Sequence, residues 1–387
     1  MFNALSDSLR ATFALDNASL GAISACYFIA NALLMYPVGM LLDRYNAKKI
    51  LLFGLCLSIL GSVFIALASS TAMVVVGRLL GGVANTFCFL SIIRIAVHWF
   101  KPEKLGFISG LIVTVGMSGG VLSQTPLLWL INRFTWHHAL LLVSGLGVLI
   151  WLYIAVIVKE KPASGSYAEI DNQEPLNTRQ IVRAFVQVAS RKNNWCCGLY
   201  ISLMNLPIMI LAGLFGTNLL VHGVHLTALE SSMVCMMLFV GMIFGSPFWG
   251  AVSDKTKGRL KPMYYAGILT LGSLLLVMLL PALSYNAYMV LFFALGFFSA
   301  GQVIGYPVIR ESNEAGVVGA AMGFVSTIIM LLPAAIQPLF GLLINNQKST
   351  ILEHTSFTHG FLLLTIAIAL GMVALVFLPE TFGNEIK

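Results

Sequence analysis

Arg78 is a charged residue that lies deep within an apolar stretch, about six residues, or roughly 9 Å of helix, after the stretch begins at residue 72. Charged side chains inside a membrane are costly and are functional by default. A guanidinium group at this depth could bind a substrate carboxylate or perturb an ion-coupling site. The other interpretation is that the long side chain extends to the nearest polar surface, and both stay open at this point.

Uncharged polar side chains recur in the other apolar stretches. Tyr27 and Asn31 are four residues apart, as are Gln302 and Tyr306, so each pair is predicted to share one helix face. Asn205 stands beside Pro207, which can interrupt a helix and free a carbonyl group. Each residue alone could simply make an interhelical hydrogen bond worth ~0.6 kcal/mol. As a set, we expect them to line a substrate path: Tyr27, Asn31, Asn85, Thr114, Gln124, Asn205, Asn218, Gln302, Tyr306, Thr327 and Gln337.

Carboxylates are absent from the interiors of the apolar stretches. Asp43, Asp254 and Glu311 stand in or beside the loops, so the sequence offers no Asp or Glu relay for protons within a membrane. A coupling proton or sodium ion stays open, as does transport without coupling. Because the sequence also has no nucleophile triad, phosphate-binding loop or metal-ligand cluster, we expect no enzymatic activity, no cofactor and no metal site.

The composition indicates which elements must position these side chains. Of the 387 residues, 58% are hydrophobic and 10% are charged, against ~25% charged residues in soluble domains. The net charge of +7 is carried by too few residues to form a basic face for nucleic acid. We predict an all-α polytopic membrane protein, because backbone polar groups in lipid must pair within a helix. The predicted spans are 18–42, 50–69, 72–97, 105–130, 138–158, 196–221, 228–252, 262–282, 286–309, 317–344 and 357–379.

Lys and Arg residues concentrate in the loops that follow every second span. Arg44 and Lys48 follow the first span, and Arg94 and Lys101 flank the end of the third. Cytoplasmic loops carry such an excess of Lys and Arg. The distribution therefore predicts a multi-pass membrane protein whose C-terminus is cytoplasmic.

An internal repeat relates the two ends of the chain. Gly39, Asp43 and Arg44 recur 211 residues later as Gly250, Asp254 and Lys255. The fourth and tenth spans match at an offset of 213. Their shared positions are Gly110 with Gly323, Thr114 with Thr327, Gln124 with Gln337, Leu130 with Leu343, Ile131 with Ile344 and Asn132 with Asn345.

The repeat predicts the domain organisation. A polar loop over residues 159–194, with an amphipathic helix over 178–191, separates a helical bundle at 1–158 from a six-helix bundle at 195–387. The repeated loop follows the second helix of the later half but the first helix of the earlier half. We therefore expect a parent architecture of six plus six helices, and hypothesise that Met1 is an internal methionine. An in-frame apolar segment in the upstream DNA would support that hypothesis.

The repeated loop carries a family resemblance. The segment GMLLDRYNAKK, from Gly39 to Lys49, resembles the signature loop of the major facilitator superfamily of transporters. Asn46 takes the place of the second glycine of that signature, where it could still adopt a left-handed turn. Arg78 with Gly82 resembles the arginine motif of that family's fourth helix, and the glycines of residues 106–120 resemble its fifth.

The resemblance implies a mechanism. Such families work by alternating access, in which two helical bundles rock about a site near the middle of the membrane. Charges that pair and separate at the loops would bias the rocking. The residues implied in gating are Gly39, Asp43, Arg44, Lys48, Arg78, Arg94, Gly250, Asp254 and Lys255.

A finer resemblance concerns the substrate. The stretch from Ser123 to Leu127, followed by Trp136, is similar to bacterial members related to lysosomal dipeptide and phagosomal amino-acid transporters. We therefore expect a monomeric carrier of an amino acid, short peptide or similar small polar solute in the bacterial inner membrane, with the lipid bilayer as its surroundings. Two alternatives stay open: a carrier of sugars, organic anions or drugs, and a membrane scaffold or sensor that does not transport.

Overall fold

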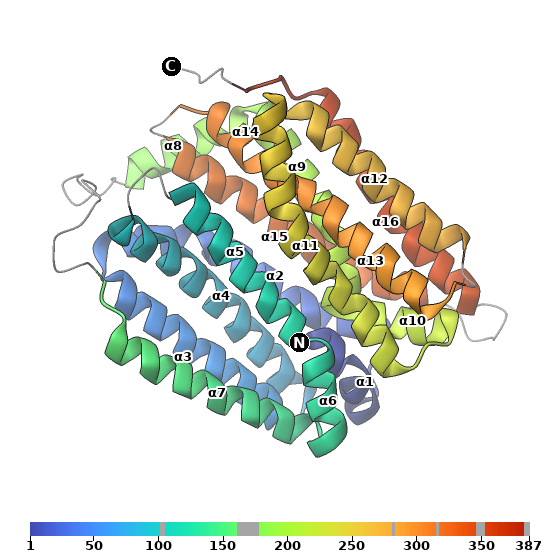
Figure 1. Cartoon of the computed structure of the whole chain (residues 1–387). Helices are drawn as coiled ribbons and strands as arrows, with labels where there is room; N and C mark the ends of the chain where they lie inside the picture. The colour runs from blue at the N-terminus through green and yellow to red at the C-terminus, as the bar shows by residue number, and fades with distance from the viewer. Residues whose placement is uncertain (101–104, 161–177, 281–282, 315–316, 346–352, 383–387) are drawn as a thin grey trace. The chain divides into compact units, whose positions relative to one another are not determined.

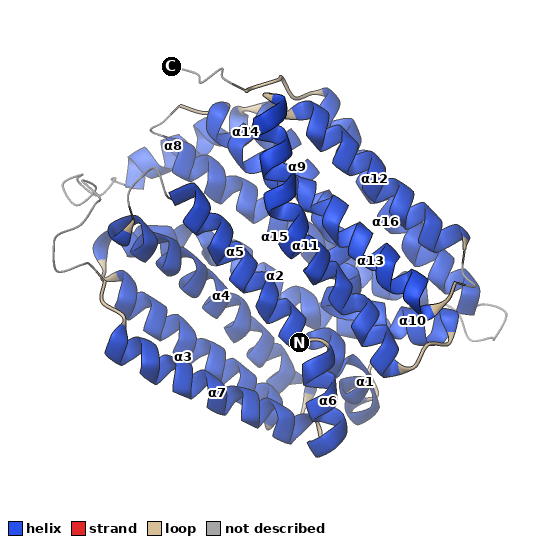
Figure 2. Ribbon diagram, in the orientation of Figure 1, coloured by secondary structure: helices blue, strands red, loops and turns tan. Residues whose placement is uncertain are grey.

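The computed structural model describes residues 1–387 apart from 101–104, 161–177, 281–282, 315–316, 346–352 and 383–387. Within these described ranges every regular element is a helix (Figure 2). Among these described residues, eleven helical stretches are long and apolar enough to cross a membrane. The predicted all-α membrane fold and its eleven spans are confirmed. The described chain divides into two compact units, treated separately below.

The smaller unit comprises residues Cys26–Gly116 and Leu130–Ile181. In it α3 packs against both α4 and α7, and the three helices run side by side in Figure 1. Val38 and Leu42 of α2 form an apolar core with Ile50 of α3 and Phe87 of α4. The helices that contribute to this unit are α2 (Asn17–Arg44), α3 (Ala47–Ala66), α4 (Thr71–Trp99), α5 (Leu105–Leu122) and α7 (Trp136–Ile157).

Glycines let the helices of the smaller unit approach each other closely. A Cβ atom at Gly82 of α4 would lie 2.2 Å from the carbonyl oxygen of Tyr27 in α2, and one at Gly61 of α3 would lie 2.8 Å from that of Gly77 in α4. Small residues commonly allow close helix packing in membranes, because lipid provides no hydrophobic driving force for helix association. This close crossing fixes Tyr27 against the middle of α4.

The larger unit comprises residues Met1–Ala25, Met117–Trp129 and Val182–Lys387. Here α11 packs against α13, while α9 packs against α15 and α16. The amphipathic helix predicted at residues 178–191 is confirmed as α8 (Thr178–Ser190), part of which lies in this unit. The principal helices are α9 (Lys192–Pro207), α10 (Gly216–Val224), α11 (Ala228–Thr256), α12 (Leu260–Leu279), α13 (Tyr285–Ser299), α14 (Gly305–Glu311), α15 (Val318–Asn345) and α16 (Glu353–Val376).

Three predicted spans are not the continuous α-helices that apolar periodicity suggested. The span 105–130 divides into α5 and α6 (Thr125–Phe134), with Pro126 in the first turn of α6, where a missing N–H is tolerated. A π-helix, η3 (Ile208–Phe215), follows Pro207 between α9 and α10. A 3-10 helix, η4 (Ala300–Ile304), lies between α13 and α14. The irregular segments are too short and too apolar to show a period of their own, so only the prolines signalled the first two breaks.

The sequence analysis missed the helix α1 (Phe2–Phe13). Its residues Phe2, Leu5 and Leu9 are buried and lie on one face, and it packs against η3 and α10 within the larger unit. The left-handed backbone of Ala14, with φ 50°, ends it. The spacing of the apolar residues in this segment was the sequence feature that could have predicted α1. The division of the chain at the loop 159–194 and the absent first helix stay predictions.

Candidate transport path and gating contacts

The π-helix η3 gathers polar side chains within the larger unit. Gln337 of α15 donates from Nε2 to the carbonyl oxygen of Met209 at 2.8 Å. Gln124, at the break between α5 and α6, donates from Nε2 to the carbonyl oxygen of Ala212 at 2.6 Å. Both glutamines are fully buried. A π-helix bonds each N–H to the carbonyl five residues back and is frequent at functional sites, so two predicted path residues meet at one irregular segment.

Asn3 extends this arrangement from α1. Its Nδ2 atom donates to Oε1 of Gln124 and to Oγ1 of Thr217, each at 3.0 Å. The backbone N–H of Thr217, in α10, donates to Oδ1 of Asn3 at 3.4 Å. All three side chains are buried. Sequence reasoning missed Asn3 and Thr217, because nothing local to either residue indicates a partner 214 positions away.

A second irregular segment, η4, contacts the end of α9 through Gln302. Its Nε2 atom donates to Oδ1 of Asn205 at 3.1 Å, one turn before η3 begins. A Cβ atom at Gly305, the first residue of α14, would lie 2.6 Å from Ile201, so the start of α14 is in close contact with α9. Gln302 is 5% exposed but Tyr306 is 38% exposed. The structure therefore brings together Asn205 and Gln302, whereas the predicted pair of Gln302 and Tyr306 differs in burial.

In the smaller unit, Arg78 lies against an aromatic ring. Its guanidinium carbon is 4.8 Å from the ring centroid of Tyr27, a cation–π contact worth about 2 kcal/mol when desolvated. The same ring lies 3.6 Å from a Cβ atom built at Gly81, one turn along α4. The interpretation in which Arg78 reaches for a polar surface is therefore less favoured than an interior position.

Asn31 lies one turn after Tyr27 on α2. Its backbone carbonyl accepts a hydrogen bond from Oγ1 of Thr86 at 3.2 Å. The side chain is fully buried, and within the described chain neither its Oδ1 nor its Nδ2 atom has a hydrogen-bond partner. Asn85, the neighbour of Thr86, is exposed in the middle of α4.

The remaining predicted path residues lie apart from these contacts. Thr327 donates to the carbonyl of Gly323 in its own helix at 3.0 Å, which is a helix-internal contact. Asn218 is 6% exposed, and its Nδ2 atom has no partner in the described part of the chain. Thr114 is half-buried in α5.

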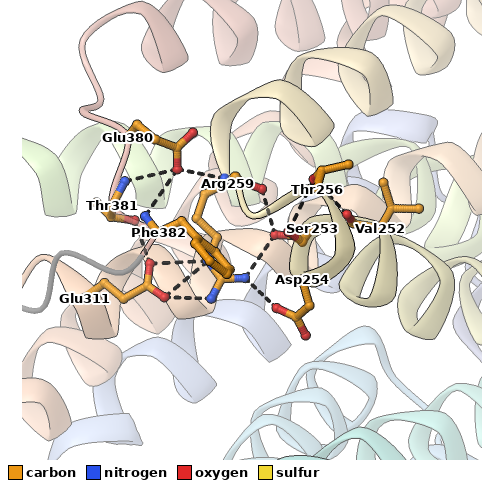
Figure 3. A network of polar contacts seen from close by, with 10 residues as sticks. Val252, Ser253, Asp254, Thr256, Arg259, Glu311, Glu380, Thr381 and Phe382 are labelled. Carbon is orange, nitrogen blue, oxygen red and sulfur yellow. Dashed lines mark hydrogen bonds and ion pairs between the residues drawn. The ribbon is translucent and has the colours of Figure 1, made fainter.

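A network of charges closes one end of the larger unit (Figure 3). Arg259, beside α12, donates from Nη2 to Oε1 of Glu311 at 2.6 Å and from Nη1 to Oδ1 of Asp254 at 2.8 Å. Glu311 in turn accepts a hydrogen bond from Oγ1 of Thr381 at 2.7 Å. The guanidinium carbon of Arg259 also lies 4.8 Å from the ring centroid of Phe382. One arginine therefore joins the ends of α11 and α14 to the segment after α16.

Glu380 adds a helix cap to this network. Its carboxylate accepts hydrogen bonds from the backbone N–H groups of Arg259 at 2.7 Å and Leu260 at 3.1 Å, at the start of α12. Burial by itself would raise the pKa of Glu380. The hydrogen bonds from the backbone N–H groups of Arg259, Leu260, Phe382 and Thr381 lower the pKa by more than burial raises it, so the pKa lies below its ordinary value. Carboxylates at helix N-termini are favoured by the unpaired N–H groups there.

The repeat reproduces this cap in the smaller unit. Glu160, which follows α7, accepts a hydrogen bond from the backbone N–H of Ala47 at 2.8 Å, at the start of α3. Each unit thus uses a carboxylate just after its last long helix to cap the helix that follows the repeated loop. The sequence analysis missed Arg259, Glu160 and Glu380 as functional candidates, although an acidic residue after the final span of each half was a visible signal.

The predicted gating residues differ in the contacts that they make. Asp254 pairs with Arg259 and not with the neighbouring Lys255. Lys48 donates from Nζ to the carbonyl of Ala155 at 2.7 Å. No described atom lies within 4 Å of a Cβ atom built at Gly39 or Gly250, so neither glycine makes room for a described neighbour.

The remaining predicted gating residues, and Asn46 between them, are placed as follows. Asn46 does not use the left-handed turn that is open to asparagine. Its φ of -57° and its side chain, which accepts a hydrogen bond from the N–H of Lys49 at 3.1 Å, make it the N-cap of α3. The side chains of Asp43 and Arg44 lie outside the described residues. Arg94 is half-buried in α4.

The eleven apolar helical stretches of the described chain define a polytopic helical protein of the membrane class. The model of the Major Facilitator Superfamily matches residues 1–224 and 197–385. The chain belongs to the Major Facilitator Superfamily, whose members are integral membrane transporters and not enzymes.

Individual relatives are distant. The chain is 24% identical to the membrane sensor protein UhpC of Escherichia coli over 98% of this chain and 87% of UhpC. It is 25% identical to the uncharacterized MFS-type transporter YceJ of Bacillus subtilis, over 66% of this chain and 62% of YceJ. The match to YybO of the same organism spans only 41% of that protein, so the chain covers less than two thirds of these two relatives.

A solved structure has the same fold. A bacterial homolog of the human lysosomal transporter Spinster, in an inward-facing and occupied conformation, superposes with a TM-score of 0.74 at 16% identity. The superposition covers 97% of this chain and 91% of that protein. At this identity the likeness is one of fold.

Proposed function

We propose that the protein is a secondary transporter that moves a small polar solute by alternating access. The observation that carries the proposal is the set of polar side chains held on the π-helix and the adjoining 3-10 helix. Gln124, Gln337 and the pair Asn205–Gln302 all meet the stretch from Asn205 to Ala212. Transporters commonly bind substrates where helices of the membrane are interrupted.

The chemistry of this set favours a solute with several hydrogen-bonding groups. Amide side chains both donate and accept hydrogen bonds, so they can exchange their present partners for those of a solute. Irregular helix turns are also where helices bend, which suits segments that must move in each transport cycle. An amino acid, a short peptide or a similar solute fits this set.

The finer assignments belong to the same proposal. The motif from Ser123 to Leu127 with Trp136 supports the branch related to lysosomal dipeptide and phagosomal amino-acid transporters. The distribution of Lys and Arg supports a cytoplasmic C-terminus, and the resemblance to bacterial members supports a bacterial inner membrane. The charge network around Arg259 would then lie on the cytoplasmic side, where Arg259, Asp254 and Glu311 would pair in one state of the cycle and separate in the other.

Counterflow into proteoliposomes tests the proposal. The purified full chain, reconstituted and preloaded with one unlabelled solute, should accumulate the labelled form of that solute, without any imposed ion gradient. A panel of neutral, basic and acidic amino acids and dipeptides should contain at least one that accumulates. Sugars, organic anions and drug-like cations on the same panel distinguish the alternative carriers, for which the 22% identical multidrug transporter MdfA of Yersinia pestis is a precedent.

A sensor is the second candidate function, favoured by the nearly full-length similarity to UhpC. A sensor would bind its solute without exchanging it across the membrane. Solute-dependent thermal stabilisation of the protein, together with a complete lack of counterflow for the stabilising solute, would support the sensor and contradict the transporter.

A further inference from the structure

We propose that α8 is an interfacial helix, which lies at the surface of the bilayer and binds the headgroups of anionic phospholipids. The place of α8 in the chain points to a membrane as its partner. It ends at Ser190, and a single residue separates it from the membrane-spanning stretch that begins at Lys192. The start of a span lies at the level of the lipid headgroups, so the end of α8 lies there too.

Side chains of the first turn of α9 hold α8 in place. Asn194 donates from Nδ2 to the carbonyl oxygen of Val188 at 3.0 Å. Trp195 donates from Nε1 to the carbonyl oxygen of Ala189 at 2.8 Å. Both carbonyl groups belong to the last turn of α8, where a helix leaves them without intrahelical partners. Asn194 also exchanges two hydrogen bonds, at 3.1 and 2.7 Å, with the buried Asn313 after α14. The corner between α8 and α9 is therefore a fixed part of the larger unit.

The larger unit covers only one edge of the apolar face of α8. Val188 is fully buried, and the ring of Phe185 lies 5.7 Å from that of Phe324 in α15. Val186 lies about 100° around the helix from Phe185, and it is 60% exposed. Phe185 and Trp195 are also partly exposed. We call Phe185, Val186 and Trp195 the exposed apolar strip.

The chemistry of the exposed apolar strip fits lipid. Aromatic side chains are enriched where a membrane meets water. Interfacial helices bury such a face at the boundary between headgroups and acyl chains. Because the strip adjoins the start of a span, a soluble partner would have to displace lipid to reach it. Lipid is therefore the cover that this position supplies.

Positive charge borders the exposed apolar strip and selects anionic lipids. Residues 178–195 contain four basic residues and no acidic one. Arg191 pairs with Glu314, whereas Arg183 and Lys192 are exposed. Arg183 precedes Val186 by three residues, or about 60° around the helix, so the two side chains stand side by side. Guanidinium groups bind phosphate oxygens with paired hydrogen bonds, and basic residues beside a span attract anionic leaflets.

The test compares lipids of different charge around the unaltered protein. The purified full chain is placed in nanodiscs of phosphatidylcholine, and of phosphatidylcholine mixed with phosphatidylglycerol. Amide hydrogen exchange of residues 178–190 is followed by mass spectrometry. We expect phosphatidylglycerol to slow exchange in α8 severalfold and to leave exchange in α12 unchanged. High salt should remove the difference, because salt screens the attraction between exposed charges.

A soluble anion separates the bilayer from its headgroup chemistry. Glycerol 3-phosphate, added to the protein in phosphatidylcholine nanodiscs, supplies a phosphate without a charged surface. It should leave exchange in α8 unchanged, because the proposed contact needs the exposed apolar strip and the cations together.

Variants assign the effect to named side chains. The double variant Arg183→Gln/Lys192→Gln should lose most of the slowing by phosphatidylglycerol, while Lys261→Gln, an exposed basic residue of α12, should keep it. Val186→Asn should reduce the slowing severalfold, and Gln187→Asn, its neighbour on the polar face, should not. Should a variant not fold, the comparisons of lipid and salt in the unaltered protein still decide.

Four results would overturn the proposal. They are equal exchange of α8 in both lipid mixtures, slowing that persists in high salt, equal slowing by glycerol 3-phosphate, and full slowing in the folded double variant. Each of these measurements is made without a transported solute, so its outcome is independent of the proposed transport function.

Discussion

Gln124 and Gln337, which the internal repeat relates at an offset of 213, donate hydrogen bonds to two carbonyl groups of one π-helix, those of Ala212 and Met209. Each glutamine comes from a different part of the chain, but both lie in the larger unit. The two repeats thus contribute equivalent side chains to one irregular segment. We regard η3 as the structural centre of the proposed path.

The first prediction concerns these glutamines. Gln124→Leu and Gln337→Leu should each lower the stability of the protein by about 1–3 kcal/mol, because each leaves a buried carbonyl without its partner. Thermal unfolding in detergent measures the loss. Gln187→Leu in α8, a partly exposed position, is the matched control and should change little. Equal stability of all three variants would contradict a stabilising role for the two hydrogen bonds to η3.

The second prediction concerns the contact between η4 and the end of α9. Gln302→Leu and Asn205→Leu should each destabilise the protein and slow transport. The double variant should be no worse than the more damaging single one, because the two side chains share one hydrogen bond. A double-mutant cycle should give a coupling of about 0.6 kcal/mol and at most about 1.7 kcal/mol. Strict additivity would show that the two residues act independently.

The third prediction concerns Arg259. Arg259→Ala should cost roughly 3 kcal/mol, since it leaves Glu311, 13% exposed, without its cation. Arg259→Lys should retain only part of this stability, because an ammonium group cannot reproduce the fork of contacts to Glu311 and Asp254. Lys261→Ala, two residues away and outside the network, serves as control. If Arg259→Ala unfolds at the same temperature as the control, the network does not stabilise the folded protein.

The fourth prediction concerns pH. The pKa of Glu380 is lower in the folded protein than its ordinary value, so the cap on α12 stabilises the fold above the ordinary carboxyl pKa and is lost as the pH falls through the lowered value. The unaltered protein should therefore be more stable than Glu380→Gln at pH 7, and the difference should disappear on acidification.

Unfolding temperatures measured from pH 7 to about pH 3.5 give that comparison. The repeat-related variant Glu160→Gln should behave in the same direction at pH 7, because it weakens the corresponding cap on α3. A difference between Glu380→Gln and the unaltered protein that grows as the pH falls would have the wrong sign for this account.

Much of the fold was predictable because it follows from composition and period. Apolar runs of sufficient length gave the eleven spans, and the amphipathic pattern gave α8. The π and 3-10 segments were not predictable, since both are short and largely apolar and show no period that distinguishes them from an α-helix. Pro207 and Pro126 indicated only that a break was allowed.

The path and gating contacts were predictable as residue types but not as partners. Polarity in mid-span singled out Gln124, Asn205, Gln302 and Gln337. The contact between Asn205 and Gln302 joins residues 97 positions apart in the chain, so no local pattern predicts it. Arg259 was missed because its partners Glu311 and Glu380 are 52 and 121 residues away, and a loop cation is ordinarily solvated.

Counterflow by the Gln302→Leu variant tests the central claim most directly. With the solute that the unaltered protein exchanges, proteoliposomes that contain equal amounts of folded protein should show a loss of initial rate of at least tenfold for Gln302→Leu, and little loss for Gln187→Leu. Undiminished exchange by Gln302→Leu would contradict a path through the irregular helices, and no exchange of any solute by the unaltered protein would contradict transport itself.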